Sequence, residues 1–245
     1  MTPGQKVTHG QVKNLSTKKT KERKRREKEA RRAKIIEAAK RMFLSQGFDT
    51  TTMKSIAIEV ELSKGTLYNY FKSKDELYLA VAAIAIREMN NFCEKIDTTK
   101  MTDLEHLLAT GYAIYDFSKH HPDLYDIVDD IRSKRLYFGE PTLEIHQKQI
   151  NEEVLNRNEQ EINKEIQRYQ KLIHDPISKA IENKVIRDDL SPIFITCTLV
   201  SLTSGLIKDL KLATAFYEHL GVNNDEIIKT VFEWVFEGLK PRKKI

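Results

Sequence analysis

The stretch from Ile35 to Leu79 constrains the fold most, because signals that start and end helices follow one another there at short intervals. Apolar residues recur at helical spacing up to Gln46, and Gly47 follows where a helix C-cap is expected. The threonines Thr50–Thr52 then offer an N-cap for another helix. This spacing predicts a helix that ends at Gln46 and a short helix that begins a few residues later.

The same stretch continues with a break and two further helix starts. We expect a break at Glu61–Ser63, followed by a short helix over Lys64–Phe71. Ser73 and Glu76 have the spacing of a capping box at the start of a longer helix. Short helices in this close succession predict a compact module with little tendency to form strands.

The remainder of the chain carries helix signals as well. Thr102 and Glu105 form a second capping box, and Ser191-Pro192 places a cap before proline at the first helical position. Only 9 glycines and 6 prolines occur in 245 residues, whereas good helix formers are plentiful. We predict an all-α fold, with an N-terminal three-helix helix-turn-helix domain followed by a larger helical domain.

Charge is distributed unevenly along the chain. Residues 1–34 contain 13 Lys or Arg and 3 Glu, a balance of +10, whereas the rest carries −5, which together give the formal net charge of +5. Such an asymmetry predicts a polyanionic partner at the N-terminal end only.

The basic N-terminal segment has two interpretations. We expect a disordered basic arm over 1–29, because its first part lacks apolar residues that would offset the entropy of ordering. The run Lys21–Lys34 is rich in helix formers, so it could also extend the first helix. It would serve either as an arm on DNA phosphates or as a solvated helix face. The expected domains are this arm, a DNA-binding domain at 30–80, and a second domain at 81–245.

The segment Phe48–Leu79 suits a helix-turn-helix that binds in the major groove of DNA. Its second short helix carries hydrogen-bond donors and slim side chains, which a helix needs to enter a groove about 12 Å wide. Leu67 and Phe71, four residues apart, are expected in the core. Ser63 is expected to cap this helix, close to a phosphate.

Two runs in this segment, Gly47–Ala57 and Ser63–Leu77, resemble the DNA-binding domain of the TetR family of transcriptional regulators in order, spacing and residue type. The resemblance implies a dimeric regulator in which Thr52 caps a helix and touches a phosphate, and Lys74 clamps another phosphate. The DNA-binding residues that it implies are Thr52, Lys54, Lys64, Thr66, Tyr68, Asn69, Tyr70 and Lys74.

Glu61 departs from the family pattern, which usually has glycine in the turn between the two short helices. A residue other than glycine in a left-handed turn costs roughly 1 kcal/mol or more. We expect the turn to persist, with the Glu61 carboxylate directed away from DNA.

By the same resemblance, the second domain binds a small effector and forms a homodimer through its last two helices. The candidates for lining the effector pocket, with plain core packing as the alternative, are Tyr112, Tyr115, Phe117, Tyr125, Tyr137 and Phe138. The candidates for the dimer interface, with monomer core as the alternative, are Leu199, Leu202, Leu206, Ile228, Val231, Phe232 and Val235. Few charges accompany the aromatic residues, so the effector is expected to be largely apolar or aromatic.

The sequence contains no motif of a catalytic site. It has no nucleophile elbow, phosphate-binding glycine loop or HExxH pair. Cys93 and Cys197 have no metal-ligand spacing and favour a reducing cytoplasm. We therefore expect no enzyme activity, no cofactor and no metal.

The function predicted is a ligand-responsive repressor whose partners are double-stranded operator DNA, a second copy of the chain and an unknown small effector. The operator would be pseudo-palindromic. The main alternative is a sequence-tolerant nucleic-acid-binding protein driven by the basic arm. A peripheral membrane protein is disfavoured, because residues 18–34 lack the Trp, Phe or Leu that an interfacial helix buries. An enzyme that processes the effector is the most distant hypothesis.

Overall fold

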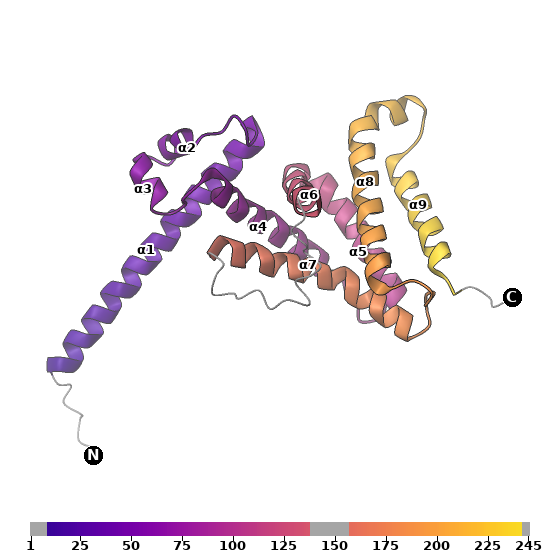
Figure 1. Ribbon diagram of the computed structural model, residues 1–245, viewed down its shortest axis with the longest axis horizontal. Helices are drawn as coiled ribbons and strands as arrows, with labels where there is room; N and C mark the ends of the chain where they lie inside the picture. The colour runs from indigo at the N-terminus through magenta and orange to yellow at the C-terminus, as the bar shows by residue number, and fades with distance from the viewer. Residues whose placement is uncertain (1–8, 138–156, 242–245) are drawn as a thin grey trace, which may run out of the picture. The chain divides into compact units, whose positions relative to one another are not determined.

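The computed structural model describes residues 9–137 and 157–241, with side chains described outside 9–17 and 134–137. The helices in chain order (Figure 1) are α1 His9–Gln46, α2 Met53–Glu59, α3 Lys64–Tyr68, α4 Lys74–Cys93, α5 Asp103–His120, α6 Pro122–Tyr137, α7 Arg157–Glu182, α8 Pro192–His219 and α9 Asn224–Leu239. No strand occurs in these ranges, and the predicted all-α fold class is confirmed.

The chain divides into two compact units, Met1–Val81 and Ala82–Ile245, which we call the head unit and the body unit. In the head unit, α2 packs against both α1 and α3. Its fully buried side chains include Ile35, Ile56, Leu67, Phe71 and Leu77. These residues come from all four helices of the unit, so one small core fixes the short helices.

The end of α1 follows the prediction. The helix ends at Gln46, and Gly47 adopts a left-handed φ of +84° while its N–H donates to the Phe43 carbonyl at 3.0 Å. The rings of Phe43, Phe48 and Tyr78 then pack with centroids 4.9–5.6 Å apart. This aromatic cluster ties the loop after α1 to α4.

The beginning of α1 differs from the disordered arm expected over 1–29. The structure has helix from His9 onward, so residues 9–29 are helical, while residues 1–8 lie outside the described residues. No glycine or proline occurs from residue 11 to 46, and Lys, Arg and Glu are good helix formers. The buried turns at Ile35–Phe43 supply the nucleus from which such a helix extends.

In the body unit, α5 packs against α6, α7, α8 and α9. Thr102 and Glu105 form the predicted capping box at its start. Gly111 allows the closest approach to α9, because a Cβ at this position would lie 2.9 Å from the Phe232 ring. The buried helix α5 therefore sets the arrangement of the body unit.

The longest helix of the body unit, α8, begins at the predicted Ser191 cap with proline at the first turn. By length and composition alone it could cross a membrane, although one such helix is weak support for a span. Ile195, Ile207 and Leu210 are buried within the body unit. The burial of these residues in the core therefore explains part of the apolar composition of α8.

Candidate functional site

The turn between α2 and α3 sets the geometry of the candidate DNA-binding site. Glu61 adopts the left-handed φ of +54°, and its N–H donates to the Ile58 carbonyl at 3.0 Å. The next N–H, of Leu62, donates to the Ala57 carbonyl at 2.8 Å. The turn therefore persists, as expected, with glutamate where the family usually has glycine, and the Glu61 side chain is exposed to solvent.

Hydroxyl caps fix the starts of α2 and α3. The Thr52 hydroxyl accepts from the Ser55 N–H at 3.0 Å, and the Ser55 hydroxyl accepts from the Thr52 N–H at 3.0 Å. The Ser63 hydroxyl accepts from the Thr66 N–H at 3.1 Å and lies 2.8 Å from the Thr66 hydroxyl. Both predicted caps are confirmed, and each orients its helix through a hydrogen bond to the N–H three residues further along the chain.

Helix α3 is shorter than the expected Lys64–Phe71. After Tyr68 the backbone tightens, with the Asn69 N–H donating to the Thr66 carbonyl at 3.1 Å and the Tyr70 N–H to the Leu67 carbonyl at 2.9 Å. The side chains of Leu67 and Phe71 are fully buried, as predicted. These two anchors hold the tightened segment against the core.

None of the eight predicted DNA-binding residues belongs to the buried core of the head unit. The exposed ones are Thr52, Lys54, Lys64 and Asn69, and the half-buried ones are Thr66, Tyr68, Tyr70 and Lys74. The Lys64 ammonium lies 5.8 Å from the centroid of the Tyr68 ring. Five of the eight come from the seven residues that follow the Ser63 cap, so a single segment supplies most of the candidate surface.

Lys74 differs from the others because its ammonium is engaged within the head unit. It donates to the Phe48 carbonyl at 2.7 Å and to the Asp49 carbonyl at 3.3 Å. It also lies 4.2 Å from the centroid of the Phe48 ring. Lys74 thus anchors the loop after α1, and the predicted phosphate contact would require it to exchange or share these partners.

Two positioning contacts were missed from the sequence. Thr51 is buried, and its hydroxyl donates to the Gly47 carbonyl at 2.8 Å. The Arg41 guanidinium pairs with the Glu59 carboxylate at 3.1 Å and joins α1 to α2. Thr51 is the middle one of three consecutive threonines, and the sequence gives no reason to single it out. Arg41 and Glu59 are 18 positions apart, so no local pattern indicates their ion pair.

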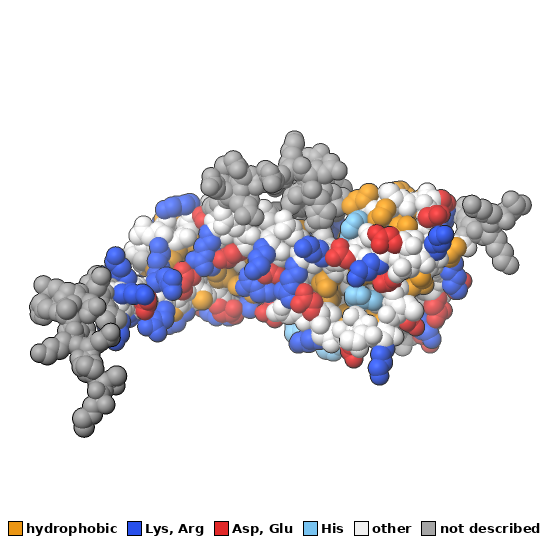
Figure 2. All heavy atoms as spheres, turned by 90° about the horizontal axis from the view of Figure 1, so that it is seen from below, with side chains coloured by type: hydrophobic (Ala, Val, Ile, Leu, Met, Phe, Trp, Pro, Cys, Tyr) orange, Lys and Arg blue, Asp and Glu red, His pale blue; other side chains and the backbone are white. Residues whose placement is uncertain are grey.

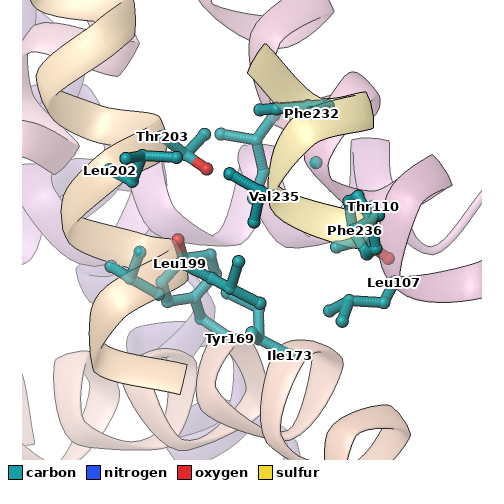
Figure 3. A pocket seen from close by; sticks show the side chains of 13 residues that line it. Leu107, Thr110, Tyr169, Ile173, Leu199, Leu202, Thr203, Phe232, Val235 and Phe236 are labelled. Carbon is teal, nitrogen blue, oxygen red and sulfur yellow. The ribbon is translucent and has the colours of Figure 1, made fainter. Parts of the chain in front are cut away.

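An apolar crevice of about 40 Å³ lies among α5, α7, α8 and α9 of the body unit (Figure 3). Tyr169 of α7 and Leu107 of α5 line it. Four residues predicted for the dimer interface also line it: Leu199, Leu202, Phe232 and Val235. The apolar residues of α8 and α9 that were predicted for the dimer interface therefore partly face each other within one subunit.

A second cavity, of about 230 Å³, is lined by α5, α8 and the start of α6 and α9. Tyr115 and Tyr125, two of the predicted effector-binding residues, line it together with Lys119. The Tyr115 hydroxyl donates to Asp225 at 2.8 Å, and burial followed by this hydrogen bond raises the pKa of Tyr115 well above its usual range. Lys119 also pairs with Asp225, at 2.9 Å, so this lining includes polar groups and its cation is paired with a carboxylate.

The other predicted effector-binding residues take different places. Phe117 is buried and packs edge-on against Phe92 with centroids 5.7 Å apart. Tyr112 packs against Phe232 with centroids 5.1 Å apart. Both are engaged in ordinary packing, whereas the Tyr137 side chain and Phe138 lie outside the described residues.

A buried carboxylate joins α4 to α7, in what we call the Glu165 cluster. Glu165 accepts from Arg87 Nε at 2.9 Å and from Asn90 Nδ2 at 3.2 Å, and it pairs with Arg168 at 3.3 Å. Burial would raise the pKa of Glu165, but the hydrogen bonds from Arg87, Asn90 and Arg168 together outweigh it and lower the pKa. Arg168 in turn pairs with Glu94 of α4.

The residues predicted for the dimer interface divide between core and surface. Ile228 and Phe232 are only 0% and 3% exposed, so they are core residues of the body unit, which is the alternative given above for these candidates. Leu202 is exposed, and Leu199, Leu206, Val231 and Val235 are half-buried. Trp234, which is not among the predicted interface residues, is 71% exposed. Spacing alone could not separate the covered side of α9 from its open side.

These features are similar to those of bacterial transcriptional regulators. A sequence model of the family described as "Bacterial regulatory proteins, tetR family" matches residues 35–81. The chain is 31% identical over 91 residues to the uncharacterized HTH-type transcriptional regulator YhgD of Bacillus subtilis (strain 168), covering 37% of this chain and 48% of that protein. It is 30% identical over 101 residues to the HTH-type transcriptional activator FasR of Mycolicibacterium smegmatis, covering 41% of this chain and 46% of that one.

The matches to these relatives span less than half of each relative's length. A likeness in fold extends much further. The transcriptional regulator FadR from Bacillus subtilis, solved in complex with stearoyl-CoA, superposes with a TM-score of 0.57 at 16% identity, over 84% of this chain and 98% of that chain. At this identity the likeness shows a shared fold.

Proposed function

This chain belongs to the tetR family of bacterial regulatory proteins through its N-terminal domain, and we propose that it is a transcriptional regulator that binds operator DNA. The observation that carries the proposal is the segment after Ser63, which combines two buried anchors with exposed and half-buried polar side chains. A segment with this arrangement suits insertion into the major groove of DNA.

The side chains of this segment would have different tasks. Lys64, Thr66 and Asn69 would contact base edges or the neighbouring sugar-phosphate backbone, and Tyr68 and Tyr70 would donate hydrogen bonds to phosphates. Base contacts specify the sequence, whereas phosphate contacts set affinity and register. Thr52 and Lys54, exposed at the start of α2, would add phosphate contacts beside them.

We propose that the chain acts as a homodimer on a pseudo-palindromic operator, with half-sites about one helical turn, roughly 34–36 Å, or a multiple of it apart. The support is the apolar surface left open on α8 and α9, which includes Phe194, Leu202, Leu212, Phe216 and Trp234. Repression is favoured over activation, because covering a promoter needs no additional contact surface. The protein would act in the cytoplasm and carry out no catalysis.

The effector would bind among the middle helices and weaken DNA binding. Phe232, Phe236 and their apolar neighbours around the crevice support a largely apolar or aromatic effector. Pockets for small ligands usually enclose about 300–1,000 Å³, so side chains around this crevice of about 40 Å³ would have to move apart. The mixed cavity at Tyr115 and Tyr125 is the second candidate, for a more polar effector.

The Glu165 cluster offers a route for this coupling. It attaches α7, which lines the apolar crevice through Tyr169 and Ile173, to the part of α4 around Arg87 and Asn90. Helix α4 begins in the head unit at Lys74 and ends in the body unit at Cys93. A ligand that displaces α7 would therefore act on the helix that both units share, to the extent that it binds the two states with different affinity.

Selection of bound sequences from random duplex DNA tests the proposed DNA binding. We expect wild type to enrich an inverted repeat and Asn69→Ala to relax the preference at one position in each half-site, by about 1–3 kcal/mol. Tyr68→Phe is the matched control, because it removes only the hydroxyl and should weaken binding to all sequences about equally. The absence of any enriched motif for wild type would refute operator binding.

Thermal unfolding with candidate ligands tests the effector site. Stearoyl-CoA is the first probe, because the regulator FadR of similar fold was solved with it. We expect a rise in Tm and release from the selected duplex, both reduced in Phe236→Ala, which opens the crevice lining. Coenzyme A without the acyl chain is the control. Stabilisation by coenzyme A alone, or by stearoyl-CoA without release of DNA, would contradict an apolar effector in this crevice.

A further inference from the structure

The three parts of the chain differ sharply in charge. Residues 18–34 carry 11 Lys or Arg and 3 Glu, whereas residues 35–81, which form the helix-turn-helix, carry 6 Lys or Arg and 6 Asp or Glu. Since residues 1–34 and the whole chain are at +10 and +5, residues 82–245 are at −5. The helix-turn-helix thus has no net charge with which to attract the phosphate backbone.

The basic residues lie on a helix that continues directly from the packed part of α1. Every side chain from Lys18 to Arg31 is exposed, and burial begins only at Ile35 and Ile36. Figure 2 shows Lys and Arg side chains gathered along this part of α1. At 1.5 Å per residue, residues 18–34 extend about 25 Å. This is the length of about seven base pairs at 3.4 Å each.

The C-terminal end of this basic segment lies next to the candidate recognition segment. The Arg32 guanidinium is 5.3 Å from the centroid of the Phe71 ring, and Phe71 is one of the two anchors of that segment. Residues 18–34 continue the packed part of α1 without a loop, and from Arg32 toward residue 18 the helix extends away from the recognition segment. Its charges are therefore held at a fixed offset from the side chains that would contact bases.

The composition of the helix excludes an apolar partner. Ala30 and Ala33 are the only apolar residues from 18 to 34, and both are exposed. An interfacial membrane helix buries large apolar side chains on one face, and a protein partner that binds a helix in a groove does the same. A surface that presents many cations and no large apolar side chain fits a polyanion.

The helix also carries like charges that repel one another. Lys21 and Arg25, and Lys24 and Lys28, are four residues apart on the helix, a spacing at which like charges are destabilising. Among the described residues of this helix, the ion pair between Arg23 and Glu27, at 3.4 Å, offsets part of this repulsion. A row of phosphates would offset the rest, so binding and helix formation favour each other.

We propose that residues 18–34 of α1 form a phosphate-binding helix, which contacts the DNA backbone outside the half-site and supplies most of the electrostatic affinity. This inference extends the proposed operator binding, because it assigns attraction to a surface separate from the one that would recognise bases. Each phosphate neutralised on double-stranded DNA contributes about 0.9 to the slope of log K against log salt.

The test compares two triple variants of the full chain with the same change in charge. The first is Lys21→Gln, Lys24→Gln and Lys28→Gln, in which glutamine preserves helix propensity. The control is Lys171→Gln, Lys208→Gln and Lys229→Gln, which removes three exposed lysines of the body unit. Binding to the selected duplex and to a duplex of fixed random sequence is measured between about 50 and 200 mM salt.

We expect the first variant to lower the slope by about 2–3 on both duplexes and to bind at least about tenfold more weakly at 150 mM salt. The ratio between the two duplexes should stay constant, because phosphate contacts carry little sequence information. The control should match wild type.

Equal slopes for wild type and both variants would overturn the proposal and leave the helix as a solvated face. Vesicles of phosphatidylserine and phosphatidylcholine test a membrane partner. If wild type binds these vesicles, and the first variant loses this binding while its DNA binding is unchanged, the proposal is overturned and a membrane partner is indicated. If wild type selects no motif while the slopes still differ as expected, operator binding fails and the phosphate-binding helix stands.

Discussion

The head unit and the body unit use the same kinds of residues in different ways. In the head unit, small hydroxyl side chains start each short helix, and the side chains next to these caps form the candidate DNA-binding surface. In the body unit, helix α9 supplies core at Phe232, crevice lining at Val235 and open surface at Trp234. Local bonds thus fix the starts of the short helices in the head unit, whereas packing partners far along the chain decide which side of α9 is covered in the body unit.

The sharpest test of this contrast is on α9. Phe232→Ala should lower the free energy of unfolding by about 3–5 kcal/mol, because the ring is buried against Tyr112 and against the space left by Gly111. Chemical denaturation measures this loss.

Trp234→Ala is the control two residues away, and it should change the stability of the folded subunit by no more than about 0.5 kcal/mol. The contrast would break down if the two substitutions had similar effects. In that case α9 would not have a covered side at Phe232 and an open side at Trp234.

The next effect in size concerns the Glu165 cluster. Glu165→Gln leaves Arg87, Asn90 and Arg168 without their common carboxylate, and we expect a loss of about 2 kcal/mol. This is less than for a fully enclosed pair, because both guanidinium groups keep contact with solvent, with 42% and 31% of their side chains exposed. Glu182→Gln, an exposed position on the same helix, is the control.

The contribution of Glu165 should depend on pH in a defined direction. Its pKa is lowered in the folded state, so the stabilisation is fully present above the ordinary glutamate value of about 4.3 and declines as pH falls through the lower folded value. The difference between wild type and Glu165→Gln in urea should therefore shrink between neutral pH and about pH 3. A difference that stays constant over this range would show that the carboxylate is not charged in the cluster.

Local and long-range contacts differ in how much could be predicted from the sequence. The caps at Thr52, Ser63 and Ser191 were predicted, because a hydroxyl and the N–H that it accepts from lie three residues apart. The pair between Glu165 and Arg87 joins residues 78 positions apart and leaves no local pattern. The same reason explains why the sequence left Phe232 open between dimer interface and monomer core.

The basic segment shows the opposite error, because local propensity was undervalued there. Its lack of apolar residues suggested disorder, but the charged residues are good helix formers and they continue a helix that is anchored at Ile35 and Ile36. Composition therefore indicated correctly that the segment has no core of its own. It did not indicate whether a neighbouring core would extend its order into the segment.

A smaller effect compares the two left-handed residues of the head unit. Gly47 has a φ of +84° and Glu61 a φ of +54°. Gly47→Ala should destabilise the chain by about 1 kcal/mol or more, whereas Glu61→Gly should stabilise it by up to about 1 kcal/mol by relieving the strain of a side chain in this region. Thermal unfolding measures both changes.

Glu61→Ala separates strain from charge at the same turn. Alanine keeps the unfavourable φ and removes the carboxylate, so it should not reproduce the gain from glycine. Equal stabilisation by alanine and glycine would mean that the charge, and not the backbone, carries the cost at Glu61.

The smallest expected effect concerns the cysteines, where stability should barely change but reactivity should differ strongly. Burial, with a further contribution from Glu94, raises the pKa of Cys93 to about 12, so its thiolate is scarce in the folded chain. Cys197 is exposed on α8, one and two turns before Ser201 and Gly205, which are exposed as well. A thiol-alkylating reagent at neutral pH should therefore modify Cys197 alone, and Cys197→Ser should abolish modification without changing Tm.

The rate of this modification also tests whether α8 is covered in a homodimer. Small residues such as Ser201 and Gly205 permit close approach of a second helix, so the proposed dimer would bury the Cys197 thiol. We expect alkylation to slow as protein concentration rises, and to slow less in Trp234→Lys, which places a charge on the open side of α9. A rate that is independent of concentration, in a chain that sediments as a dimer, would place the contact elsewhere on the body unit. The open apolar side of α8 and α9 would then need another explanation than pairing.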